Sequence, residues 1–384
     1  MNLLDRSFYA RDPYPALADL RTNEPVYHDS ETGLWALLRY DDIVAAEKRT
    51  DVFSSAHGSR PLNGPQPSMI DSDDPLHHRR RSLVDKGFRA RNVLSVEPHV
   101  REIARELIDC VASLGACDLV GDLAASLPMI VIAEMLGVRK EDRALLQHWS
   151  DTMISGADGI ANVTEDVLRS YADFTSYMDE IIEARRKEPR DDVISKLVHA
   201  EIDGERLSHE ELIGEALLIL IGGNETTRSA ISGGLLALMQ FPDQRRRLVN
   251  DPSLLHSAVE ESLRWVTPVI NMARTTTQDI GVRGTSIPIG DQVLLMYISA
   301  NRDESIFDRA DDFDITRNPN PHLAFGQGVH HCLGAALARL ETAVMFEELL
   351  RRIPDMEPAS DDFLQTPSSF VRGLPRLPVT FSPR

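Results

Sequence analysis

The sequence predicts a mainly α-helical fold with a small β portion, and three observations carry this prediction. Apolar residues recur at helical spacing through most of the chain between residues 92 and 260. Short strand-like runs bounded by turn residues occur before and after this region. No Pro/Gly/Ser-rich linker divides the 384 residues, so we expect a single domain over residues 1–384.

The helices are expected where the periodicity is strongest. Four patterns precede the centre of the chain, at residues 99–114, 122–136, 141–154 and 166–186. A longer pattern, GEALLILIGGNETTRSAISGGLLALMQ, covers residues 214–240 and has a polar interruption at its centre. Two further helices are expected over residues 257–265 and 333–353, and the second of these directly follows a cysteine.

Strand-like segments lie on both sides of the helical region. Near the N-terminus, EPVYHDSETGLWALLR predicts two short strands around a Thr-Gly turn. After the helices, IGVRGTSIPIGDQVLLMYIS (280–299) again has strand character, and we expect Pro-Ile-Gly-Asp to form its hairpin turn. The segment HGSRPLNGPQPSM (57–69) is expected to be an irregular loop.

Composition excludes several classes of function. The net charge of −19, from 60 acidic and 41 basic residues, argues against a nucleic-acid-binding surface. Three cysteines are too few for a disulfide framework, which indicates a reducing compartment. No window of the sequence reaches the ~18 apolar residues of a membrane span, and the first residues show no apolar signal region. We therefore expect no integral membrane segment and a cytoplasmic location.

The segment FGQGVHHCLG places one cysteine, Cys332, directly after two histidines. Gly326 and Gly328 bracket a turn in which the backbone can approach a flat partner closely. Cys332 then precedes a helix, whose dipole and free N–H groups stabilise a thiolate. We expect Leu333 and Gly334 to present their N–H groups to the sulfur.

Three interpretations of Cys332 compete. A small buried filler is the usual role of a lone cysteine, but it leaves the glycines unexplained. A zinc site built from His330, His331 and Cys332 is unfavourable, because adjacent residues cannot easily reach one tetrahedral ion and no second cysteine pair follows. A haem thiolate ligand accounts for every part of the segment, including Phe325, which can shield the sulfur from water.

The polar interruption in the 214–240 helix is a second clue to function. Two glycines in the middle of a helix cost roughly 1 kcal/mol each relative to alanine, and close packing against another helix is the ordinary explanation. Gly222, however, lies four residues before Thr226, so the threonine hydroxyl can bond the Gly222 carbonyl and open the helix locally. We expect a small groove lined by Gly222 and Gly223 and flanked by Glu225 and Thr226, which could hold O₂ and deliver protons.

The cysteine segment resembles the haem-binding signature of the cytochromes P450, Phe-x-x-Gly-x-His/Arg-x-Cys-x-Gly. All five specified positions match, with Phe325, Gly328, His330, Cys332 and Gly334. The resemblance implies the cytochrome P450 fold, in which haem b lies between a long central helix and the cysteine loop. It also implies that Cys332 ligates the iron and that the other four residues contact the cofactor.

The central helix carries the same resemblance, because GGNETT is similar to the oxygen-activation motif Ala/Gly-Gly-x-Asp/Glu-Thr of this family. The resemblance implies that Thr226 and Glu225 are the catalytic residues. Thr226 would assist the activation of O₂, and Glu225 would relay protons. Gly222 and Gly223 would lie beside the cofactor.

Basic residues match the family positions that bind the two haem propionates. His77 and Arg81 are spaced i,i+4 in DDPLHHRRRSLV, where family members have His-x-x-x-Arg. The propionates need cationic or N–H donors, and the resemblance implies that Arg274 and His330 complete the set.

Glu261 and Arg264 are spaced i,i+3 on an expected helix. By itself such a pair indicates a surface salt bridge of little worth. The family instead buries Glu-x-x-Arg beneath the haem, together with an arginine of the loop before the cysteine, which corresponds to Arg317. This loop departs from the family pattern at Ala310, where a proline is usual.

The resemblance covers nearly the whole chain and is strongest to the actinobacterial steroid side-chain hydroxylases, through stretches such as LLILIGG, PVINM and FVRGL. It implies a haem-thiolate monooxygenase that inserts one atom of O₂ into an unactivated C–H bond of a lipophilic substrate. We expect terminal hydroxylation of a sterol side chain, of the cholesterol or cholest-4-en-3-one type.

Other functions are kept as alternatives. A branched fatty acid or a macrolide is the alternative substrate. A peroxygenase that uses H₂O₂ directly is disfavoured by the acid–alcohol pair, because family members of that kind lack it. A haem-thiolate sensor without turnover is the alternative of another class.

Substrate contacts and electron donors follow from the same reasoning. The side chains expected to line the substrate pocket are Met69, Leu218, Val269, Met272, Phe370 and Val371. Arg372 is expected to point away from that pocket. Electrons are expected to come from a small ferredoxin and its NAD(P)H-dependent reductase, because no flavin or reductase segment is evident in the sequence.

Overall fold

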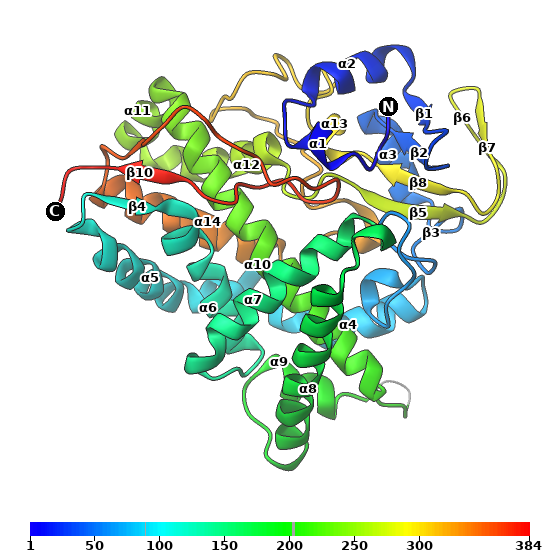
Figure 1. Ribbon diagram of the computed structural model, residues 1–384, viewed down its shortest axis with the longest axis horizontal. Coiled ribbons are helices and arrows are strands. Elements are labelled where there is room, and N and C mark those ends of the chain that lie inside the picture. The colour runs from blue at the N-terminus through cyan, green and yellow to red at the C-terminus, as the bar shows by residue number, and fades with distance from the viewer. Residues whose placement is uncertain (89, 202–203) are drawn as a thin grey trace.

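The computed structural model describes residues 1–88, 90–201 and 204–384. Helices make up most of the molecule, and the strands gather mainly in one sheet at the side where the N-terminus lies (Figure 1). The mainly α architecture with a small β portion is therefore confirmed.

The helices follow the expected pattern closely. Those of the N-terminal half are α1 (Arg6–Tyr9), α2 (Tyr14–Asn23), α3 (Tyr40–Lys48), α4 (Leu76–Phe88), α5 (Ala90–Ala112), α6 (Ser126–Met135), α7 (Arg143–Ile154) and α8 (Glu165–Lys187). Those that follow are α9 (Val193–His199), α10 (His209–Gln240), α11 (Pro242–Asn250), α12 (Leu255–Val266), α13 (Tyr297–Ala300) and α14 (Ala335–Arg352). The helix expected over 122–136 is divided, because a π-helical segment at Leu119–Ala124 precedes α6.

The strands form three sheets. Five of them lie in the order β1-β2-β8-β5-β3, with bounds β1 (Val26–His28), β2 (Trp35–Leu37), β8 (Gln292–Leu295), β5 (Met272–Thr276) and β3 (Phe53–Ser54). A smaller sheet contains β4 (Ala116–Asp118), β10 (Pro378–Thr380) and β9 (Glu357–Pro358), and a hairpin contains β6 (Ile280–Val282) and β7 (Thr285–Ile287). In the large sheet β2 and β8 pair in parallel, whereas the other neighbours are antiparallel.

The hairpin expected at Pro-Ile-Gly-Asp (288–291) is wrong. The turn lies earlier, at Arg283 and Gly284, and joins β6 to β7 through the pair Val282 and Thr285. Both turn residues have positive φ, 49° and 83°, which is the backbone of a two-residue turn whose twist matches that of the strands. The Pro-Ile-Gly-Asp segment instead leads from β7 into β8 in the large sheet.

The long helix α10 organises the core. Ser208 caps its N-terminus, because its side chain accepts a hydrogen bond from the Glu211 N–H at 3.2 Å while the Glu211 carboxylate accepts one from the Ser208 N–H at 2.7 Å. Most of its residues from Leu212 to Met239 are buried, as expected of a helix that is apolar on nearly all sides. It packs against α6, α12 and α14 (Figure 1). Within the described residues, no helix is both long and apolar enough to cross a membrane.

Candidate functional site

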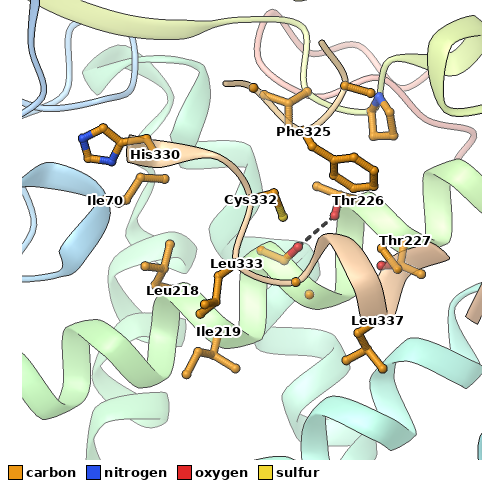
Figure 2. A pocket seen from close by; sticks show the side chains of 18 of the residues that line it. Ile70, Leu218, Ile219, Thr226, Thr227, Phe325, His330, Cys332, Leu333 and Leu337 are labelled. Atoms are coloured by element: carbon orange, nitrogen blue, oxygen red, sulfur yellow. Dashed lines mark hydrogen bonds between the residues drawn. The ribbon is translucent and has the colours of Figure 1, made fainter. Parts of the chain in front are cut away.

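A pocket lies between α10 and the loop that carries Cys332 (Figure 2). Both elements contribute side chains, and the expected contacts that line the pocket are Met69, His77, Arg81, Leu218, Gly222, Gly223, Thr226, Val269, Met272, Arg274, Phe325, His330, Cys332 and Gly334. These residues come from segments far apart in the sequence. The structure thus brings together the cysteine segment, the glycine-interrupted helix and the basic residues of α4 and β5.

Two glycines determine the path of the cysteine loop. Gly326 and Gly328 have φ values of +61° and +72°, in the left-handed region that side chains disfavour. A Cβ atom at Gly328 would also lie 2.7 Å from the backbone oxygen of Glu47 in α3. Gly328 does not line the pocket. A glycine is therefore required at position 328 by the turn and by the nearby backbone of α3. We had expected the requirement to come from the close approach of a flat partner.

Cys332 is held at the inner end of this loop by a hydrogen bond from its own N–H to the Phe325 carbonyl, at 2.9 Å. Burial raises the pKa of the Cys332 thiol, whereas the N–H groups of Gly334 and Ala335 act to lower it. The positive charges of Arg81 and Arg339 act in the same lowering direction. The expected N–H contact of Gly334 is present, and Ala335 is a second donor that the sequence did not indicate. This donor set suits a thiolate bound to a cation.

The histidines next to Cys332 do not converge with it on one ion. His330 Nε2 lies 3.1 Å from the Ser55 hydroxyl, and its ring lies 4.2 Å from the ring of His77. In the described part of the chain, no group of three or more His, Cys, Asp and Glu side chains could hold a metal ion. The positions of His330 and Cys332 therefore do not favour a zinc site built from this segment.

Each glycine of the central helix has its own role. Gly222 is exposed although it lies in the middle of α10, and a Cβ atom there would meet nothing within 4 Å. A Cβ atom at Gly223 would lie 2.4 Å from Ile132 of α6. Gly223 is thus required by helix packing, whereas Gly222 opens the helix to the pocket. The expected hydrogen bond from the Thr226 hydroxyl to the Gly222 carbonyl is present at 2.8 Å (Figure 2).

Glu225 does not line the pocket. It is 2% exposed and forms an ion pair with Arg228, whose guanidinium also lies 2.8 Å from Asp151. Burial raises the pKa of Glu225, and its Oε2 atom has no hydrogen-bond partner within the described residues. Neighbouring helical residues point about 100° apart, so Glu225 and Thr226 face different surroundings.

The basic residues expected to bind propionates share one side of the pocket. His77, Arg81, Arg274 and His330 all line it, and His77 Nε2 is buried without a hydrogen-bond partner among the described residues. Burial, reinforced by the charges of Arg274, His77 and Arg81, lowers the pKa of His330 to about 2. His77 therefore lacks a partner that a carboxylate could supply, and the guanidiniums of Arg81 and Arg274 have further donors for a pair of carboxylates. Haem, with its flat body and two propionates, fits this pocket.

The supporting ion pair is buried. Glu261 and Arg264 are both fully buried and are joined by two hydrogen bonds of 2.8 Å. Arg317 Nε lies 3.2 Å from the same carboxylate, so the expected trio is assembled. Arg264 also donates to the carbonyl of Ala310 at 2.8 Å, so the chain keeps this loop in place without the usual proline. The alternative of a surface salt bridge is wrong.

Two expected substrate contacts lie behind the pocket wall. Phe370 and Val371 are buried in a small cluster with Ala157, and Val371 forms a backbone bridge with Val269. They support Val269 and Met272, which do line the pocket. Arg372 is absent from the pocket lining, as expected.

Several pocket residues were missed by the sequence reasoning. Most are apolar or small, among them Ile70, Phe88, Ile132, Ile219, Leu263 and Leu337. Glu341 of α14 is a carboxyl group in this set, and burial raises its pKa to about 8, which favours its neutral form. Helical spacing could have predicted this position from the sequence, because Glu341 follows Leu337 by four residues and so lies on the same, buried face of α14.

Comparisons with known proteins agree with this site. The family described as Cytochrome P450 matches residues 160–373. The chain is 46% identical over 391 residues to a steroid C26-monooxygenase of Mycobacterium tuberculosis, covering 100% of this chain and 97% of that protein. It is 43% identical over 363 residues to a methyl-branched lipid omega-hydroxylase of the same species, covering 91% of this chain and 84% of that protein.

A solved structure shows the same fold. The crystal structure of a cytochrome P450 from Bacillus megaterium in complex with testosterone matches with a TM-score of 0.90 and 33% identity, covering 99% of each chain. The family match, the relatives and the pocket that suits haem all indicate a haem enzyme. They do not favour the alternative of a sensor without turnover. The chain belongs to the cytochrome P450 family and is a haem-thiolate monooxygenase.

Proposed function

We propose that the protein hydroxylates the terminal methyl group of a sterol side chain, with a molecule of the cholesterol or cholest-4-en-3-one type as substrate. One observation carries the choice of a neutral ligand. Among the described residues, the arginines that line the pocket are Arg81 and Arg274, both in the basic cluster, and no described lysine lines it. A fatty-acid carboxylate would therefore find no separate cation among the described residues of the pocket, and the relative named steroid C26-monooxygenase supports the sterol.

We assign the iron ligand to Cys332 and the propionate contacts to His77, Arg81, Arg274 and His330. Haem, when bound, supplies the activation of O₂ and the insertion of one oxygen atom into the C–H bond. The N–H groups of Gly334 and Ala335 limit the electron density on the sulfur. Phe325 lines the pocket beside Cys332 (Figure 2) and restricts access of water to the sulfur.

Proton delivery is assigned to Thr226 and Glu225. The Thr226 hydroxyl is held by Gly222 and lies at the pocket wall, where it can pass a proton inward. Burial raises the pKa of Glu225 and so favours its protonated carboxyl, while the charge of Arg228 acts in the opposite direction. Because Glu225 faces Arg228 and Asp151, its side chain or an intervening water must bring the proton to Thr226.

Electron supply, location and domain organisation complete the proposal. We assign electron supply to a small ferredoxin with its NAD(P)H-dependent reductase, which is the arrangement that the family resemblance implies. The cytoplasmic location and the single domain over residues 1–384 stay predictions.

A branched lipid is the second candidate substrate, favoured by the relative named methyl-branched lipid omega-hydroxylase. Titration of the haem-loaded protein with cholest-4-en-3-one, a methyl-branched fatty acid and a macrolide distinguishes the candidates. We expect the sterol to convert the haem to high spin and to give the terminally hydroxylated product with ferredoxin, reductase and NADH. Conversion by only the fatty acid or the macrolide would remove the sterol assignment and leave the monooxygenase intact.

A further inference from the structure

A second cleft, of about 670 Å³, lies beside the C-terminal half of α10. Its lining shares no residue with the haem pocket. α10 contributes Ser229, Gly233 and Gln240, and the remaining wall comes from residues 10–12, the start of α2, the end of α12, Arg302, Asp311 and the segment 363–374. The volume is within the range of about 300–1,000 Å³ that is usual for small-molecule sites.

A buried guanidinium dominates this cleft. Arg302 is 4% exposed, and its guanidinium carbon lies 3.7 Å from the Trp265 ring and 4.3 Å from the Tyr14 ring. Its ion pair with Asp311, at 3.3 Å, involves a carboxylate that is 80% exposed. The Nε atom of Arg302 has no hydrogen-bond partner within the described residues. Its Nη2 atom donates to the Trp265 carbonyl at 3.4 Å. A buried cation with an unused donor, whose ion-pair partner is exposed, is incompletely compensated.

A second guanidinium lies close by. The guanidinium carbon of Arg372 is 5.2 Å from the same Tyr14 ring, and its Nη1 atom donates to the Tyr9 carbonyl at 3.4 Å. No carboxylate of the described chain lies within ion-pair distance of Arg372. Burial raises the pKa of Tyr14, but the charges of Arg372 and Arg302 outweigh burial and lower it below its ordinary value. The local potential is therefore positive, in a protein of net charge −19.

The rest of the lining is amphipathic. Arg11 and Asp12 are exposed residues of this lining and offset each other in charge. Leu236, Val266, Phe363 and Leu374 supply apolar surface. Two neighbouring guanidiniums repel each other, and their planar donors match the oxygens of a carboxylate or phosphate. An amphiphilic anion would satisfy both parts of the cleft.

We propose that this cleft binds a small amphiphilic molecule whose carboxylate or phosphate group pairs with Arg302 and Arg372 and whose apolar body lies against Leu236 and Phe363. The site is separate from the substrate pocket and binds an anionic ligand instead of a neutral one. The sterol proposed as substrate is neutral, whereas this ligand is held by its charge.

The proposal is tested by calorimetry on the haem-loaded protein, with the haem pocket filled by the azole miconazole so that only other sites can bind. The probes are octanoate, octyl phosphate and the neutral octanol. The variants are Arg372→Gln and Arg302→Lys, the second of which retains the charge but loses the planar donors. Arg246→Gln is the matched control, because Arg246 is 72% exposed on α11 and lies outside the cleft.

We expect octanoate or octyl phosphate to bind, octanol to bind at least tenfold more weakly, and Arg372→Gln to weaken the anion at least tenfold. Arg246→Gln should bind as the wild type does. Tighter binding of octanoate would indicate that the natural ligand carries a carboxylate. Tighter binding of octyl phosphate would indicate that it carries a phosphate. The proposal is overturned if neither anion binds below about 10 mM, if octanol binds equally well, or if both Arg372→Gln and Arg302→Lys bind the anion unchanged.

Discussion

The cofactor end and the substrate end of the pocket are built in different ways. At the cofactor end, Cys332, His77 and Arg274 are each placed by glycine turns, ring contacts or hydrogen bonds. At the substrate end, Leu218 and Met272 pack against clusters of apolar side chains, and one polar contact stands out, from the Met69 N–H to the Glu215 carboxylate at 2.6 Å.

This difference has a physical cause. Iron and propionates demand particular atoms at particular places, so a change of residue type at the cofactor end removes a required interaction. Apolar contact is non-directional and scales with buried area, so side chains at the substrate end can be exchanged with modest loss. Changes at the cofactor end should therefore have large effects, and changes at the substrate end should have small ones.

The largest effect is expected at Cys332. Cys332→His should abolish product formation, because an imidazole lacks the electron donation of a thiolate. The reduced protein with carbon monoxide should lose the red-shifted band of thiolate-ligated haem and show the band of histidine-ligated globins. Cys110→Ser and Cys117→Ser are the matched controls and should keep the band. An unchanged band in Cys332→His would show that another residue ligates the iron.

Next in size is the buried ion pair. Arg264→Ala should lower the free energy of unfolding by about 3–5 kcal/mol, because the buried Glu261 carboxylate loses its main partner. Urea unfolding and haem content measure the loss. Arg169→Ala, which removes an arginine 63% exposed on α8, should change stability by less than about 1 kcal/mol. Equal effects of the two changes would contradict the buried role of Arg264.

Glu215 tests the one polar contact at the substrate end. Burial raises its pKa from 4.5 to about 7. The folded state therefore holds a proton that the unfolded state releases, and the stability that this proton contributes is lost as pH rises from 4.5 through 7. The difference corresponds to about 3 kcal/mol.

Glu215→Gln keeps an oxygen that can accept a hydrogen bond from the Met69 N–H, but its side chain cannot ionise. The free energy of unfolding of this variant should therefore not show the decrease between pH 4.5 and 7. Urea unfolding at pH 5 and pH 8 measures the slope, and Glu210→Gln, exposed on the same helix, is the control. If wild type and Glu215→Gln lose stability equally between these pH values, the group does not titrate as described.

Thr226 lies where the two ends meet. Thr226→Ala should still bind substrate and consume NADH, but the yield of product per NADH should fall roughly tenfold or more, with peroxide released instead, because proton transfer by a positioned group commonly contributes about 10²–10⁴-fold. Thermal melts of the same variant separate this role from helix shaping. A normal yield per NADH would remove Thr226 from proton delivery.

The smallest effect is expected at the apolar wall. Leu218→Ala should weaken sterol binding by about 1–3 kcal/mol at most, which is the usual range for lost apolar contact. The spin-state titration measures it, with Leu114→Ala, 67% exposed, as control. A loss as large as that of a cofactor-end change would show that the substrate end is also built from specific contacts.

Prediction from the sequence succeeded most fully where a residue type has few substitutes. The cysteine segment and the GGNETT interruption identified the family, and the hydrogen bond from Thr226 to Gly222 followed from four-residue spacing alone. The prediction of a hairpin turn at Pro-Ile-Gly-Asp was wrong because turn-forming residues occur both there and at Arg283-Gly284. Only the pairing of β6 with β7 shows that the turn lies at Arg283 and Gly284.

The sequence by itself determined that this chain is a haem-thiolate monooxygenase of mainly α architecture, because a thiolate loop and a helix opened by Thr226 need particular residues at particular spacings. Only the tertiary structure decided which way each side chain faces. It brought Asp151 of α7 to Arg228 of α10, placed Phe370 behind the wall and put Arg302 beside Arg372 from segments seventy residues apart. Such contacts depend on the relative placement of whole helices and strands, which local spacing does not encode.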